Sequence, residues 1–350
     1  MKNYLLLLLL TSITCMTAQS VSISTESAPV EYYRMPDYPL PKEYTTYSSN
    51  LDMSFTELSK SGFTESYLID TYLKLEGYKQ VNKNPDVEIT ATVGEFIVWS
   101  EIRNTNRNKT KDKNGVEQVR YTYSMTVKYS QPMGLQVFNK EGKTLIDEYV
   151  FTMSDTRSWT SSTYSSMSDL DSYWRIQRKT KLSDLQKDLM KEGMNIISDQ
   201  INDNFGFQLI NDKIKFAAIG KKSHPDYDRF QKNVEIMQAA FELMDADKGL
   251  NAVKAKAQPA LEFYATSAQK YSTGNKDQKK LKHICLYNQA LAYCWLEDFD
   301  QAETLAKSIQ KFDTKNKDVK RLLEDIEYTR ASLVNADRPS RHQVIVGQKT

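Results

Sequence analysis

The chain has 350 residues, with 47 basic and 45 acidic side chains and a formal net charge of +2 at neutral pH. A nearly neutral chain lacks the basic field that non-specific nucleic-acid binding requires, so we expect no nucleic-acid partner. Hydrophobic residues make up 40% of the chain, which is enough to form real cores, and the length favours two domains.

Residues 1–18 have the pattern of a secretory signal peptide. A short basic start precedes an apolar run from Tyr4 to Leu10, and small residues follow up to Ala18. This pattern predicts cleavage after Ala18, and the apolar run is too short to span a bilayer. The alternative is a lipoprotein signal with lipidation of Cys15, the one case in which we expect membrane attachment. Both interpretations predict export, to a periplasmic or outer-membrane-associated location.

Export would leave two cysteines, Cys285 and Cys294, on one predicted helix. Nine helical residues separate them by about 13 Å, which is too far for a disulfide. We expect both to be small buried apolar residues, so that the exported protein relies on its cores and not on disulfides.

Residues 19–43 become rich in proline and tyrosine, and we interpret them as an extended tether. Residues 44–220 then show the period-2 alternation of strands, interrupted by two helical stretches. We expect strands near 44–55, 86–93, 96–102, 121–129, 135–138, 145–153 and 214–219, and helices at 65–76 and 182–205. Consecutive hairpins favour a mostly antiparallel sheet with both helices on one face, which is an α+β domain.

One stretch of this domain carries a family resemblance. Glu76-Gly77-Tyr78-Lys79, followed by Asn84-Pro85-Asp86-Val87-Glu88-Ile89, resembles small α+β domains of bacterial envelope lipoproteins of largely unknown function. In those domains, too, a helix ends in glycine and an aromatic residue, and the next strand begins with Pro-Asp. The resemblance is short, and it implies an envelope location without implying any chemistry.

Two segments of the same domain are candidate ligand sites. Residues 103–115 hold five basic residues beside Asp112, and as a hairpin tip they would touch anionic lipid head groups or polysaccharide. Residues 154–174 are dense in serine and threonine and include Trp159 and Trp174, which could stack on sugars. The alternatives are a solvated hairpin tip and a loop whose aromatic side chains lie on the sheet.

No motif identifies a reaction or a cofactor. The three histidines, His224, His283 and His342, have no paired-ligand spacing, and no nucleophile elbow or phosphate-binding glycine loop occurs. Asp245-Ala246-Asp247 opens like a calcium loop, but Gly249 comes one position early and Lys256 stands where the bidentate glutamate belongs. We therefore expect no catalytic residue, no metal and no cofactor.

Residues 225–335 change to the helical period of 3.6, and this change predicts that residues 225–350 fold alone. Residues 336–350 are a polar tail that we expect to be frayed. Between Lys279 and Asn316, two helices and a tight turn are expected. Ala290 and Ala302 are small enough for close approach of the two helices, and Ala306 continues the inner face of the second helix.

This stretch resembles one tetratricopeptide repeat, a helix-turn-helix unit with a period of 34 residues. Tyr293 and Phe299 bracket the turn, but Gln289 stands where leucine is usual and Thr314 replaces the usual proline. The resemblance implies a concave face that holds a protein partner, with Gln289 and Tyr293 as candidate binding residues. An ordinary α-hairpin is the alternative.

These observations predict an exported, non-enzymatic envelope protein that acts as a protein-protein interaction scaffold through its helical repeat-like domain. The alternative is an envelope module that binds glycan or lipid, using the aromatic segment at 154–174 or the basic tip at 103–115.

Overall fold

A computed structural model describes residues 21–111 and 113–345, of the 350 in the chain. The predicted signal peptide, its cleavage site and Cys15 lie outside the described residues. Helices account for 43% and strands for 28%, with the sheets mainly in the N-terminal half, so the predicted α+β class is confirmed. Within the described part, each helix is either too short or too polar to cross a lipid bilayer.

The chain forms two compact units, which we describe separately. The first, here the β unit, contains residues 34–208 together with 335–337 and 344–345. The second, here the helical unit, contains residues 21–33, 209–334 and 338–343.

The β unit contains a five-stranded sheet with the order β3-β2-β4-β7-β8. Its strands are β2 (Thr46–Met53), β3 (Lys79–Gln80), β4 (Val87–Val93), β7 (Met133–Asn139) and β8 (Thr144–Phe151). β4, β7 and β8 are antiparallel neighbours, but β2 runs parallel to both β3 and β4. The sheet is therefore mixed, because the helices between β2 and β4 supply the long crossover that parallel pairing needs.

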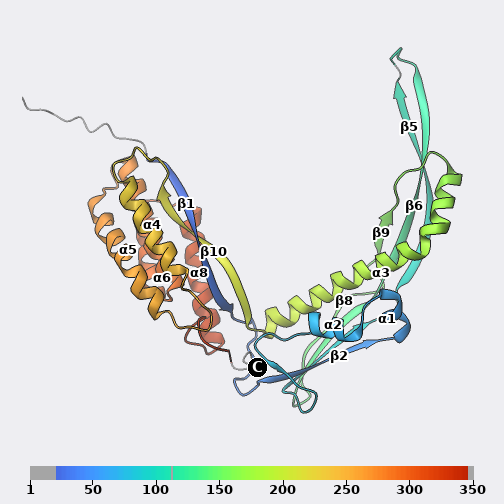
Figure 1. The fold of residues 1–350 in the computed structure, drawn as a ribbon, viewed down its shortest axis with the longest axis horizontal. Helices are drawn as coiled ribbons and strands as arrows, with labels where there is room; N and C mark the ends of the chain where they lie inside the picture. Colours follow the sequence, from blue (N-terminus) through green and yellow to red (C-terminus); the bar gives the residue numbers. More distant parts are fainter. Residues whose placement is uncertain (1–20, 112, 346–350) are drawn as a thin grey trace, which may run out of the picture. The chain divides into compact units, whose positions relative to one another are not determined.

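The helices of this unit are α1 (Phe55–Ser61), α2 (Glu65–Tyr72) and α3 (Met167–Phe205). Each begins at a hydroxyl side chain, from Ser54, Thr64 or Ser166, which accepts a hydrogen bond from a first-turn amide. α3 contacts β6, β7 and β8 (Figure 1). Gly193 permits the close approach, because a Cβ there would collide with the sulfur of Met133.

A second sheet has the order β5-β6-β9, with β5 (Ile97–Lys111), β6 (Glu117–Ser130) and β9 (Arg157–Thr160). The strand expected at 96–102 continues to Lys111, so most of the basic segment 103–115 is strand and only its end is a turn. Gly115 has a positive φ of 81° in that turn.

The helical unit begins with a strand, which corrects the predicted tether. β1 (Ile23–Arg34) pairs with β10 (Gln208–Ile219) in a two-stranded sheet. β10 therefore does not join the sheet of the preceding domain, where the sequence had placed it. Ala28 and Val30 on β1, and Phe216 on β10, are buried in one core with the helices. The alternation of Ala28 and Val30 provides one apolar face, and burial of that face outweighs the polar composition of the segment.

Five helices complete the described part of this unit: α4 (Tyr227–Phe241), α5 (Asn251–Lys270), α6 (Lys276–Trp295), α7 (Phe299–Gln310) and α8 (Lys317–Asn335). The expected helical hairpin is α6–α7, and Ala290, Ala302 and Ala306 are buried in it. Cys285 and Cys294 are buried free thiols.

The expectation of a frayed tail is wrong for residues 338–343. Arg341 and His342 are buried, and Arg341 Nε lies 3.2 Å from Glu297 Oε1. The guanidinium carbon of Arg341 lies 5.1 Å from the ring centre of Tyr32 and 4.7 Å from that of Trp295. These partners are distant in sequence, so the polar composition of the tail did not reveal them.

Candidate functional site

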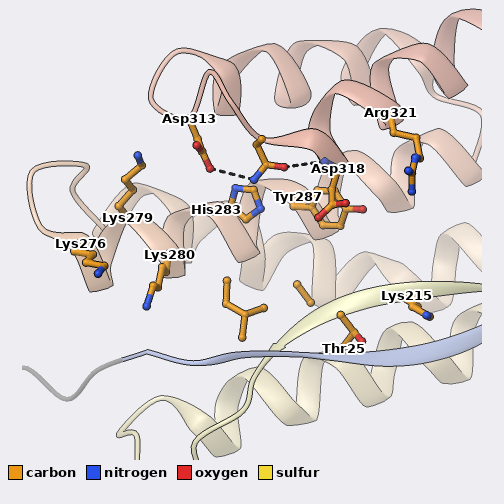
Figure 2. Close-up of a pocket in the computed structure, with 13 residues that line it drawn as sticks. Thr25, Lys215, Lys276, Lys279, Lys280, His283, Tyr287, Asp313, Asp318 and Arg321 are labelled. Atoms are coloured by element: carbon orange, nitrogen blue, oxygen red, sulfur yellow. Dashed lines mark hydrogen bonds between the residues drawn. The ribbon is translucent and has the colours of Figure 1, made fainter.

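A pocket of about 840 Å³ opens in the helical unit, between α6, the start of α8 and the β1–β10 strands (Figure 2). We call it the basic pocket. Its lining consists of Ile23, Thr25, Lys215, Ala217, Lys276, Lys279, Lys280, His283, Tyr287, Asp313, Asn316, Asp318 and Arg321. The volume is in the range of pockets that hold a small ligand or a short peptide segment.

The first wall of the basic pocket is one face of α6. The side chain of Asn275 begins this helix by accepting hydrogen bonds from the amides of Asp277 and Gln278. Lys276, Lys279 and Lys280 then follow at spacings of three and four residues, so the helix presents them on the same side.

The opposite wall is the beginning of α8. Asn316 Oδ1 accepts hydrogen bonds from the amides of Asp318 and Val319, each at 3.1 Å, and so caps this helix. Its Nδ2 donates to Asp313 Oδ2 at 3.0 Å, which fixes one carboxylate of this wall (Figure 2). Arg321 follows Asp318 by three residues and lines the same pocket.

Strands β1 and β10 close the pocket with Thr25 and Lys215. β10 is held against α6 by Asn288, whose Oδ1 accepts from Ala217 N and whose Nδ2 donates to Ala217 O, both at 2.8 Å. Asn288 is fully buried, so this pair of hydrogen bonds fixes the position of β10 along α6. In that position, Lys215 of β10 lines the pocket.

The cations of the pocket are incompletely neutralised. Lys215, Lys276 and Arg321 have no ion-pair partner among the described residues. Lys280, by contrast, donates to Val21 O at 2.6 Å and lies 3.7 Å from Asp277. With the two carboxylates of the opposite wall, the lining still has an excess of positive charge, which favours an anionic ligand.

His283 and Tyr287 provide a flat neutral surface inside the pocket. Their rings are stacked with centres 5.7 Å apart and planes 10° from parallel. Burial lowers the pKa of His283, which favours the neutral imidazole, and burial raises the pKa of Tyr287, which favours the neutral phenol. His283 Nδ1 is itself buried and has no hydrogen-bond partner in the described structure.

The pocket does not resemble a metal centre. Across residues 21–111 and 113–345, no group of three or more histidine, cysteine, aspartate and glutamate side chains is placed to hold a metal ion. The chemistry that the lining does offer is charge attraction, hydrogen bonding and stacking.

The binding residues that were predicted from the sequence do not line the basic pocket. Gln289 lines a different groove of about 640 Å³, together with residues of α5 and α7. It is only 4% exposed, and its Nε2 donates to Cys285 O at 3.1 Å, so little of the side chain faces the groove. Tyr293 is half-buried against the helical core. Their roles in binding a partner stay predictions.

Trp159 and Trp174 lie in the β unit and belong to regular structure, on β9 and α3, while residues 154–156 and 161–166 of the expected loop lie outside these elements. Their rings pack with centres 6.0 Å apart. Trp174 is 5% exposed and donates to Glu101 Oε2 at 2.7 Å, so it is not available to stack on a sugar. Trp159 is half-buried beneath Lys181.

The basic pocket was not predicted from the sequence. The spacing of Lys276, Lys279, Lys280 and His283 on one helical face was a usable signal. Lys215 had no such signal, because its place depends on the pairing of β10 with β1.

No protein-family model matches the chain, and no curated protein matches it either.

Proposed function

We propose that the protein is an exported, non-catalytic envelope scaffold, and that its helical unit binds an acidic segment of a protein partner in the basic pocket. The observation that carries this proposal is that Lys215, Lys276 and Arg321 surround one pocket of about 840 Å³ and have no ion-pair partner in the described part of the chain. Carboxylates of a partner would pair with them, and they would do so without displacing an existing ion pair.

The tetratricopeptide-like character of α6–α7 is part of the same proposal. A helical hairpin whose inner face is filled by Ala290, Ala302 and Ala306 is a rigid support for side chains on its outer faces. Lys276, Lys279 and Lys280 stand on such a face, so a partner would meet preorganised cations. Gln289 and Tyr293 would extend the contact along the neighbouring groove.

The first test is direct binding of a fluorescent peptide of alternating glutamate and glycine to the full mature chain. We expect salt-sensitive binding, and we expect the double variant K276E/R321E to weaken it by roughly tenfold or more, because like charges then face each other. The matched control is K254E/K256E, which reverses two exposed charges of α5 that lie outside the pocket. Equal weakening in both double variants would contradict a specific pocket.

The partner itself is addressed by co-purification from native envelopes with the same variants. We expect an acidic protein to be recovered with the wild-type chain and with K254E/K256E, and to be lost with K276E/R321E. Recovery of the same protein with all three chains would place its binding site elsewhere.

A further inference from the structure

The outer part of the β5–β6 hairpin, residues 105–111 and 113–122, is a two-stranded arm. β9 pairs with β6 only from Thr126 to Tyr129, and an isolated bridge joins Tyr123 to Tyr164. Beyond that bridge, in the part of the chain that the structure describes, β5 and β6 pair only with each other. The arm extends past the end of α3 that begins at Met167 (Figure 1).

The two faces of the arm differ in chemistry. Directly opposed residues of an antiparallel pair share a face. On one face, Arg107 is opposite Tyr121, Lys109 is opposite Val119, and Lys111 is opposite Glu117. We call this the basic-apolar face. The other face carries the opposed pairs Asn106 with Thr122, Asn108 with Arg120, and Thr110 with Gln118.

Nearer the base of the hairpin, the same face of β6 is buried. There, Met125 and Val127 occupy the same face and are fully buried. α3 contacts β6, and its Trp174 donates to Glu101, the residue opposite Val127. Past α3 the face is bare, and Tyr121 is 50% exposed.

Charge and apolar side chains occur together on the arm. It contains five basic residues and two acidic ones: Arg107, Lys109, Lys111, Lys113 and Arg120, against Asp112 and Glu117. Lys109 pairs with Glu117 at 2.7 Å, whereas Arg107 and Lys111 have no ion-pair partner among the described residues. Val116, in the turn, is 59% exposed. The arm is therefore locally basic in a chain that is nearly neutral.

We propose that the basic-apolar face of the arm binds an anionic phospholipid surface. Lysine and arginine side chains beside a membrane are attracted to anionic head groups, and tyrosine is favoured at the membrane interface. Val116, Val119 and Tyr121 would enter the interfacial layer while Arg107 and Lys111 contact phosphate. A soluble polyanionic glycan would satisfy the cations but would leave the apolar side chains in water. This surface is in the β unit and is independent of the basic pocket.

The experiment is co-sedimentation of the full mature chain with vesicles of phosphatidylcholine, with and without phosphatidylglycerol, at physiological salt. We expect binding only when phosphatidylglycerol is present. The double variant R107Q/K111Q should lower the association constant by roughly tenfold or more, because two charges are lost from the binding face. Y121S should weaken binding to the same vesicles while leaving its salt dependence unchanged.

The matched control is R120Q/K128Q, which removes two charges from exposed, even-numbered positions of β6 that point to the opposite face. We expect this variant to keep the wild-type affinity, and circular dichroism should show that all variants are folded. Equal losses in the two double variants would overturn the proposal, as would equal binding to vesicles without phosphatidylglycerol. Binding to dextran sulfate but not to vesicles, or association of the arms of two chains without vesicle binding, would also overturn it.

Discussion

Glu297, Arg341 and His342 form a buried polar cluster in the helical unit. The Glu297 side chain is 7% exposed, its Oε1 accepts from the amide of Arg341 at 2.8 Å, and His342 Nδ1 lies 3.3 Å away. Burial alone would raise the pKa of Glu297, but His342, Arg341 and Ser340 together outweigh it and lower the pKa to about 2. The ionised carboxylate of Glu297 therefore stabilises the packing of the C-terminal segment against the helical unit.

This cluster predicts a pH dependence of stability. The pKa of Glu297 is lower in the folded state than its ordinary value of 4.5, so its stabilisation is complete above pH 4.5 and is lost as the pH falls toward about 2. The shift corresponds to about 3 kcal/mol of unfolding free energy. E297Q should therefore be less stable than wild type at pH 7, and the difference should shrink between pH 4.5 and pH 3 in urea titrations followed by circular dichroism.

The control for this measurement is E327Q, which changes an exposed carboxylate of α8. We expect it to keep the wild-type free energy of unfolding across the same pH range. A difference between E297Q and wild type that stays constant from pH 7 to pH 3 would show that Glu297 is not depressed in pKa.

At the scale of elements, the α6–α7 hairpin depends on small residues at the helix contact. Ala302 is fully buried, and Asp298 Oδ1 accepts from the amide of Gln301 at the start of α7. A302L should overpack the contact and cost about 1–3 kcal/mol of unfolding free energy. The same substitution at the exposed Ala331 of α8 serves as the control and should change stability little. A silent A302L would mean that the two helices can separate without loss, and that the register inferred from the repeat resemblance is wrong.

This hairpin also shows what local sequence could predict. Ala290 and Ala302 mark the close contact by size and spacing, and the β7–β8 hairpin follows from its turn, where Gly142 has a φ of 75°. These signals are local, because the partners are within a few turns or strands of one another. The row of lysines on α6 is a signal of the same kind, so one wall of the basic pocket could have been predicted from the sequence.

The other elements depend on pairing between distant segments, which periodicity does not encode. The alternation on β1 predicts a strand face, but it does not state that β10, about 180 residues later, is the partner. Lys215 could not be placed in the pocket without that pairing. The parallel pairing of β2 with β4 was missed for a related reason, since local periodicity does not state which strands of a sheet are neighbours.

At the scale of the whole molecule, the helical unit is discontinuous in sequence. Its core contains Ala28 and Val30 of β1 and Phe216 of β10, together with residues of α4–α8. The ring of Phe216 packs against Phe241 of α4 with centres 5.3 Å apart. A fragment that begins at residue 225 therefore lacks both strands, and it exposes apolar surface as well as the buried amide of Asn288, which bonds Ala217.

Arg34 and Gln208 both contact Oδ1 of Asp203, so the chain leaves β1 and returns to β10 at neighbouring points. A chain in which a short glycine-serine linker joins Tyr33 directly to Leu209 should keep the helical unit intact, because its core residues all remain. We expect it to unfold cooperatively in urea with a strongly helical circular dichroism spectrum. The fragment 225–350 should lose this cooperativity, because removal of β1 and β10 exposes to water the apolar core surface that these strands cover. If the fragment 225–350 proves as stable as the linked chain, then β1 and β10 do not contribute to the stability of the helices. In that case residues 225–350 fold alone, as the change to the helical period of 3.6 predicted.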